Sequence, residues 1–433
     1  MKYRYFLFLL GCFFSFQVLA QSLSIIRDAE IETKLESYMK QAFKVAHLDE
    51  NKAKVVLIQD DSINAFVAGG YTIFVHTGLI THASAPDDVM FVLSHETGHI
   101  KGGHAIRGME KYKQAQTTSL VSSLLGGALA VALGRPDAGL ALMIGGQQTA
   151  ANNFLSYRQT EESAADRIAV DIMNQTNYSL KGFTNIMSEI KRQERLQPER
   201  KTGYLSSHPL TQNRQADLRR FVDSSQSVKQ EDAFDMMKAK LFAFLYEPKY
   251  TFNVYKGTSD ADLYAQAIAF YKSHQLPKAV EKIDILISKQ PNNPYLYELK
   301  GQFYFESGQI KKAIPMYQKA VELLPENALL RISLAQTLLE QEEVSHSKEV
   351  IRHLSFAVLK EPEIPLAWQL LATAYYRANE PFKADYAMAE YYFITRQSQR
   401  AEQMAERVIK NMPASSSQVK KAKEILYQIQ HKN

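Results

Sequence analysis

The residues best suited to chemistry in this chain are His95–His99, with the sequence HETGH. An α-helix turns by about 100° per residue, so two imidazoles four positions apart lie on one face and can share one metal ion. Glu96 lies beside them, where a carboxylate can act as a general base. The pattern predicts a zinc site for metal-assisted hydrolysis of peptide bonds, with His95 and His99 as ligands and Glu96 as the base.

The preceding residues predict the helix that this spacing requires. Its start is indicated by a cap candidate, a first-turn proline and two acids at the positive end of the helix dipole: Ser84, Pro86, Asp87 and Asp88. Apolar residues then recur at near-helical spacing to about Lys111. The motif is therefore expected in the middle of a helix.

A catalytic zinc ion usually takes a third protein ligand, and a second helix can supply it. Arg158, Glu162 and Asp166 recur every four residues and share one helix face. Glu162 is predicted to bind the metal, and Asp166 to hold the Nδ1–H of a ligand histidine. Glu161 lies about 100° further round the helix and stays an alternative. One zinc ion per subunit is expected.

Other histidines lack helical spacing to the pair. His76, His82 and His104 are predicted to be surface or structural residues, and His104 is expected to face away from His99.

Residues 1–20 have the pattern of a secretory signal peptide, with Lys2 and Arg4 before an apolar stretch and a small-residue cleavage site at Ala20. The alternative is cleavage before Cys12, which would leave a lipid-anchored protein. Cleavage after Ala20 removes the chain's only cysteine, so nitrogen and oxygen ligands alone are left for a metal.

A chain of 433 residues is too long for one ordinary core, so at least two domains are expected. We divide it into a signal peptide, a peptidase domain, a connecting helix with linker and a repeat domain, at residues 1–20, 21–225, 226–258 and 259–433. The formal charge of +5 is too small for a dedicated nucleic-acid surface, so no nucleic-acid partner is predicted.

The first domain is expected to hold a helix over residues 22–48 and a small antiparallel sheet. Lys54–Gln59 reads as a strand, and Phe66–Val75 as a hairpin around two glycines. Asn64 and Ala65 are candidate substrate-binding residues, because a sheet edge can pair with an extended peptide; ordinary strand sequence is the alternative.

Between Lys113 and Arg158 the only charged residues are Arg135 and Asp137. A membrane-spanning helix needs about 20 apolar residues, and several polar side chains interrupt both halves of this segment. A packed helical hairpin, or a flap over 117–155 that contacts a membrane surface, is favoured over a transmembrane hairpin.

Beyond residue 260 small residues and prolines recur every 34 residues, at Ala267, Gly301 and Ala335, at Ala279 and Ala313, and at Pro291 and Pro325. This period is typical of tetratricopeptide repeats, in which small residues let paired helices approach. A three-residue insertion near 342–347 precedes later units. We expect about four repeats and a capping helix, forming an α-solenoid with a concave binding surface.

The combined motifs resemble family M48 of zinc metallopeptidases. The resemblance rests on H-E-x-x-H, on E-x-x-A-D at Glu162–Asp166, and on H-P-x-x-x-x-R at His208–Arg214. It implies a mainly α fold with a zincin-like (gluzincin) α+β domain and Glu162 as the third ligand. It also implies catalytic roles for Arg214, which would stabilise the oxyanion, and for His208, near the metal or the tetrahedral intermediate. Capping of a loop is the alternative for His208. The family often has arginine three residues before its glutamate, whereas Arg158 stands four before Glu162.

The order of signal, peptidase and repeats is similar to that of M48 peptidases in the periplasm of Gram-negative bacteria. That likeness implies a periplasmic enzyme that degrades stalled or misfolded outer-membrane proteins, engages the β-barrel assembly machinery through its repeats and has a chaperone-like role. A repeat-based scaffold whose zinc is structural, or whose hydrolysis is dispensable, is the alternative.

Overall fold

The computed structural model describes residues 24–431 except 69, 105–106, 108–109, 111–113, 115, 118–135, 197–203, 205–207, 223–226 and 342–346. The predicted signal peptide and Cys12 lie outside these residues, as does the middle of the 117–155 segment.

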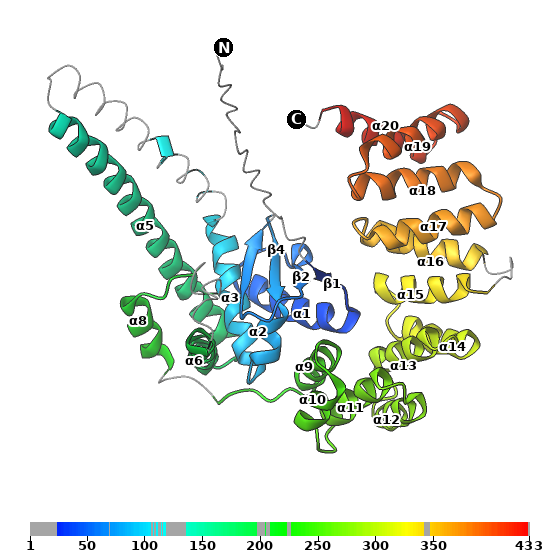
Figure 1. Cartoon of the computed structure of the whole chain (residues 1–433), viewed down its shortest axis with the longest axis horizontal. Helices are drawn as coiled ribbons and strands as arrows, with labels where there is room; N and C mark the ends of the chain where they lie inside the picture. The colour runs from blue at the N-terminus through cyan, green and yellow to red at the C-terminus, as the bar shows by residue number, and fades with distance from the viewer. Residues whose placement is uncertain are drawn as a thin grey trace, which may run out of the picture.

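The described chain forms a mixed α/β part followed by helical hairpins, which lie on opposite sides of the view in Figure 1. The helices of the first part are η1 (Glu50–Lys52, a 3₁₀ turn), α1 (Ala29–Val45), α2 (Thr77–His82), α3 (Pro86–Gly102), α5 (Pro136–Gln175), α6 (Lys181–Leu196) and α8 (Gln212–Val222). Two connecting helices follow, α9 (Asp232–Leu245) and α10 (Pro248–Val254).

One sheet contains β1 (Ile25–Ile26), β2 (Lys54–Ile58), β3 (Ala65–Ala68) and β4 (Thr72–His76), in the order β1-β2-β4-β3. β3 and β4 form the predicted antiparallel hairpin, but β2 and β4 pair in parallel. The expectation of a wholly antiparallel sheet is therefore wrong. Ile73 and Val75 of β4 are fully buried, whereas most of β3 is partly exposed. Because of this burial β4 takes an inner position beside β2, and β3 takes the edge.

Two predicted helix boundaries differ in the structure. Asp28 accepts hydrogen bonds from the backbone N–H groups of Glu30 and Ile31 and so starts α1, which leaves Ile25–Ile26 as a strand before it. α3 ends at Gly102, short of Lys111, because Gly103 has a φ of 61° in the left-handed region.

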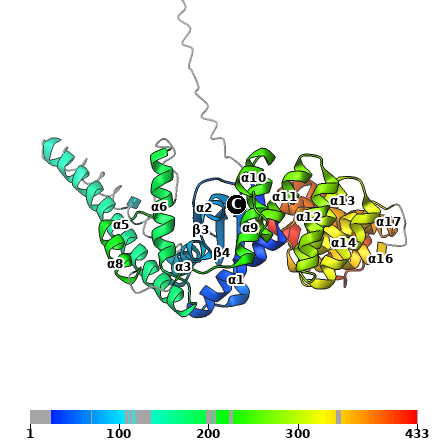
Figure 2. The same cartoon turned by 90° about the horizontal axis from the view of Figure 1, so that it is seen from below.

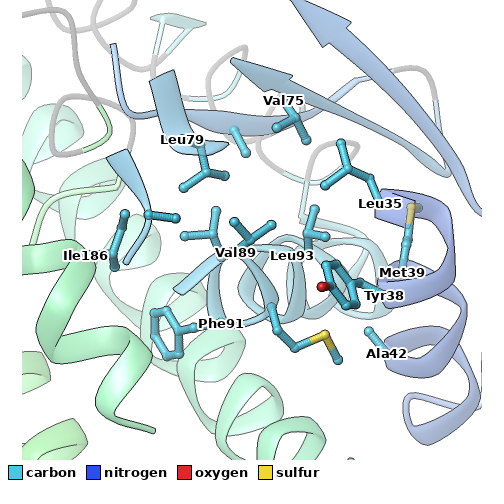
Figure 3. Packing of buried hydrophobic residues seen from close by; sticks show 14 of the residues in the cluster. Leu35, Tyr38, Met39, Ala42, Val75, Leu79, Val89, Phe91, Leu93 and Ile186 are labelled. Carbon is cyan, nitrogen blue, oxygen red and sulfur yellow. The ribbon is translucent and has the colours of Figure 1, made fainter. Parts of the chain in front are cut away.

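α3 runs through the centre of the first core. Figure 3 shows Val89 and Leu93 of α3 below Val75 of the sheet, with Leu35 of α1 to their right, and all four are fully buried. The apolar faces of α3 fix its rotation, so the motif helix is held between the sheet and the surrounding helices. α5 packs along α3 and projects beyond it (Figures 1 and 2). Among the described residues, no helix is long and apolar enough to cross a membrane.

The second part consists of helical hairpins. Its helices are α11 (Asp260–Lys272), α12 (Leu276–Lys289), α13 (Pro294–Glu306), α14 (Ile310–Leu323), α15 (Ala328–Leu339), α16 (Ser347–Lys360), α17 (Pro365–Arg377), α18 (Pro381–Ile394), α19 (Ser398–Asn411) and α20 (Ser417–Gln430). The predicted small residues are buried at helix contacts, and a Cβ on Gly301 would lie 3.1 Å from the Tyr317 ring. The four expected hairpins are followed by a fifth pair, α19 and α20, rather than by a single capping helix.

The two parts meet at a buried charge cluster. Lys240 of α9 is 1% exposed, and its ammonium lies 2.8 Å from Asp28, 3.2 Å from Glu30 and 3.4 Å from Glu298 of α13. The Tyr264 hydroxyl of α11 donates to Glu30 at 2.7 Å. The start of α1 is therefore bound to the first two repeats.

The start of α1 also joins two apolar cores. Ala29 packs in the core of the repeats, whereas Ile31 packs in the core around α3. A second contact lies further along the solenoid, where Lys54 of β2 pairs with Glu363 at 2.5 Å.

Candidate metal centre

The site forms where α3 and α5 approach closely. A Cβ on Gly98 would lie 2.8 Å from the Ala165 Cα, so only glycine allows this packing without a shift. The contact places Glu162, one turn before Asp166 on α5, opposite His95 and His99 on α3.

Four side chains direct donor atoms at one point. His95, His99, Glu162 and His208 each offer one atom, and these atoms lie within 4.8 Å of one another. His95 Nε2 is 3.1 Å from His99 Nε2, and Glu162 lies 3.4 Å from each of these nitrogens. His208 Nδ1 is 3.1 Å from Glu162 Oε1. All four side chains are buried or nearly so, which excludes bulk water from the cluster.

The donor set fits a divalent metal ion. Imidazole nitrogens and a carboxylate oxygen are the ligands that zinc takes in catalytic sites. The Nε2 atoms of His95 and His99 face one another, an arrangement that costs free energy unless a proton or a cation lies between them. The Oε1 atom of Glu96 and the Nε2 atom of His208 are buried with no hydrogen-bond partner, 3.3 Å apart.

The pKa shifts show that the four side chains interact strongly and that the two ligand histidines differ. Burial acts to lower the pKa of His95, but Asp166 and Glu162 outweigh burial and raise it to about 10. Burial, followed by the neighbouring His95, lowers the pKa of His99 to about 2. Burial acts to raise the pKa of Glu162, yet hydrogen bonds from His208 and His95 lower it overall.

Glu96 lies between the cluster and the sheet edge. It is 1% exposed, and burial raises its pKa above the ordinary value of 4.5. The backbone of Val67, in edge strand β3, hydrogen-bonds to its carboxylate. A raised pKa makes this carboxylate a better proton acceptor once it is ionised.

Asp166 and Arg214 support the cluster from behind. Asp166 Oδ1 lies 2.9 Å from His95 Nδ1, the contact that the helix spacing predicts. Arg214, at the start of α8, donates to both oxygens of Asp166 at 2.7 and 2.9 Å and lies 3.0 Å from Glu162. It also donates to the Pro209 carbonyl at 2.6 Å. These bonds direct the guanidinium at the supporting carboxylates.

The remaining candidates lie apart from the four donors. Glu161 faces Tyr157 and lies 4.0 Å from Arg107. His76 bonds to Ser62, and His82 pairs with Glu189. Asn64 directly precedes edge strand β3 and Ala65 begins it, two residues before Val67, whose backbone bonds to Glu96.

Two residues of the site were not predicted. His104 does not face away: its Nδ1 lies 2.8 Å from His99 Nδ1. The Gly102-Gly103 pair is a sequence signal that could have indicated this return. Tyr204 is buried and stacks on His208 with ring centroids 4.7 Å apart. No spacing rule in the sequence connects Tyr204 to the motif.

Comparison with known proteins agrees with this geometry. The model of peptidase family M48 matches residues 27–222, and a tetratricopeptide repeat model matches residues 304–364.

Two curated bacterial relatives match most of this chain at modest identity, and a third relative matches a shorter stretch. A Beta-barrel assembly-enhancing protease of Yersinia pestis is 24% identical over 329 residues, covering 73% of this chain and 66% of the relative. The protein of the same description from Escherichia coli (strain K12) is 23% identical over 380 residues, covering 84% of this chain and 74% of the relative. The Mitochondrial metalloendopeptidase OMA1 of Arabidopsis thaliana is 28% identical over 87 residues, or 20% of this chain and 18% of the relative.

The family matches, the relatives and the buried His/Glu cluster lead to one conclusion: the chain carries a metalloprotease domain of family M48 followed by tetratricopeptide repeats.

Proposed function

We propose that this protein is a periplasmic zinc-dependent endopeptidase that acts in the assembly and quality control of outer-membrane β-barrel proteins. The observation that carries the proposal is the buried group of His95, His99 and Glu162 beside the carboxylate of Glu96. The donor atoms suit zinc, and Glu96 is placed as a general base.

The residues divide the chemistry between them. A zinc ion held by His95, His99 and Glu162 would polarise the scissile carbonyl and lower the pKa of a water molecule. Glu96 takes a proton from the attacking water and passes it to the leaving amine. Burial raises its pKa above the ordinary value, which makes the ionised carboxylate a stronger proton acceptor.

We assign a positioning role to Asp166 and Arg214. Asp166 holds His95 through Nδ1, and this contact leaves Nε2 free for the metal. Arg214 binds Asp166 with two donors and also approaches Glu162, so its charge balances the two carboxylates. The contacts with Glu162 and Asp166 favour this role over oxyanion stabilisation.

His208 is placed to control access. Its Nδ1 lies among the metal donors, and its Nε2 lies 3.3 Å from Glu96, where a substrate carbonyl would have to enter. The described arrangement thus suits a closed site, and hydrolysis requires His208 to move aside.

Edge strand β3 is the proposed substrate track. Its free edge lies beside Glu96 through Val67, so an extended peptide that paired with β3 from Asn64 and Ala65 onward would pass the base. An unfolded outer-membrane protein offers such extended segments.

The repeats are proposed to select clients and to engage the β-barrel assembly machinery, with a chaperone-like contribution. The description of the two bacterial relatives, which cover most of this chain, supports the proposal. Contact of 117–155 with a membrane surface belongs to the same proposal. A repeat-based scaffold with a structural zinc is the competing function.

The test is Glu96→Gln in the full chain. Loss of the base should reduce cleavage of an unfolded outer-membrane protein by about 10²-fold or more while zinc stays bound. Glu161→Gln is the matched control. It is the same change at a carboxylate next to Glu162 that is not one of the four metal donors. Cleavage is followed by gel and zinc by elemental analysis.

An unchanged cleavage rate in Glu96→Gln would refute the catalytic assignment. Lost cleavage with full support of outer-membrane protein assembly in cells would favour the scaffold function instead.

A further inference from the structure

His99 contacts a second imidazole outside the donor set. His104 is 6% exposed, and its Nδ1 lies 2.8 Å from His99 Nδ1. The two rings meet edge to face, with centroids 4.9 Å apart and planes at 77°. At that distance one nitrogen must donate and the other must accept.

The chain is built to bring His104 back onto His99. Gly103 ends α3 with a left-handed φ of 61°, so the backbone leaves the path of the helix directly before His104. Gly102 leaves the space that the ring fills, because a Cβ there would lie 2.1 Å from His104 Nε2. Both glycines are therefore needed for the contact between His99 and His104: Gly103 supplies the left-handed backbone, and Gly102 leaves room for the ring.

Ligation fixes the direction of this hydrogen bond. His99 turns Nε2 toward His95 and Glu162, so Nε2 is the atom available to a metal. A neutral imidazole with a free Nε2 carries its proton on Nδ1. His99 Nδ1 must then donate, and His104 Nδ1 must accept.

We propose that His104 is a positioning residue of the metal centre, which accepts the Nδ1–H of His99 and fixes both its tautomer and its ring orientation. The inference rests on the proposed function, because it requires a metal at the cluster. It gives His99 the support that Asp166 gives His95, but with a neutral acceptor instead of a carboxylate. The two ligand histidines are thus held by different chemistry.

The test compares zinc affinities of the full chain, measured by competition with a chromogenic chelator. His104→Phe fills a similar volume but cannot accept, and should raise the Kd for zinc about 10- to 100-fold. His104→Asn places a carbonyl oxygen near the position of Nδ1 and should recover most of that loss. His82→Phe, the same change at a histidine outside the cluster, is the control and should leave the Kd unchanged.

Gly102→Ala tests the contact without altering either histidine. Its Cβ would displace the His104 ring, so zinc binding should weaken while the metal-free protein stays folded by circular dichroism. Combined with His104→Phe it should add no further loss, since both changes remove the same hydrogen bond.

A wild-type Kd for zinc in folded His104→Phe would overturn the inference. Equal losses of zinc affinity in His104→Phe and His104→Asn would overturn it as well. Absence of zinc binding by the wild-type protein would instead overturn the proposed function, so the two failures are distinct.

Discussion

At the residue scale, the adjacent glutamates Glu161 and Glu162 of α5 lie in different surroundings. Glu162 is 4% exposed among the metal donors, whereas Glu161 faces Tyr157 outside them. We expect Glu162→Ala to lose bound zinc and Glu161→Ala to keep one ion per chain. His208→Ala should also keep zinc, because three donors remain. Elemental analysis of the purified variants decides, and full zinc in Glu162→Ala would contradict the ligand assignment.

Most of the donor set could be predicted because helical spacing places His95 with His99 and Glu162 with Asp166 on defined faces. Helical spacing could not predict the contacts of Arg214 and His104. Arg214 bonds across α5 and α8, and that depends on packing between segments far apart in sequence. His104 depends on a left-handed glycine, whose φ a helical pattern does not reveal.

At the scale of elements, the approach of α3 to α5 determines the site. Gly98→Ala would place a Cβ 2.8 Å from the Ala165 Cα, so the helices must separate. Overpacking of this kind costs about 1–3 kcal/mol, and we expect both a lower free energy of unfolding and weaker zinc binding. Thr97→Ala, at the other x position of H-E-x-x-H, is the control. Its effect on stability and on zinc binding should be smaller, because it removes side-chain atoms instead of adding them. Urea unfolding with and without chelator provides the measurement; an unaltered zinc affinity in Gly98→Ala would contradict this account.

The elements themselves were largely predictable. Strand and helix patterns located β2, the β3–β4 hairpin and α9, and the 34-residue period located the repeats. The parallel pairing of β2 with β4 was missed because strand patterns give the buried face but not the partner. In this sheet the more exposed strands β1 and β3 lie at the edges, and the more buried strands β2 and β4 lie inside.

At the scale of the whole molecule, the charge cluster around Lys240 makes stability depend on pH. Burial raises the pKa of Glu298 from 4.5 to about 7, against the lowering effect of Lys240. Between these values the folded protein holds a proton that the unfolded chain has lost. The free energy of unfolding should therefore fall as pH rises through this window, by about 3 kcal/mol at most, and stay level above it.

Glu298→Gln should flatten this dependence, since the amide does not titrate. Glu326→Gln is the control, because Glu326 is an exposed carboxylate of the same repeat domain. Urea unfolding at pH 5, 6, 7 and 8 measures the slope. A slope that persists unchanged in Glu298→Gln would place its origin in another group.

The first turn of α1 has a consequence for how the molecule melts. Ala29 belongs to the core of the repeats and Ile31 to the core of the peptidase, although only one residue separates them. Fraying of this turn removes apolar contacts from both cores at once. Unfolding of either part should therefore lower the stability of the other, and we expect the two parts to be coupled in thermal denaturation.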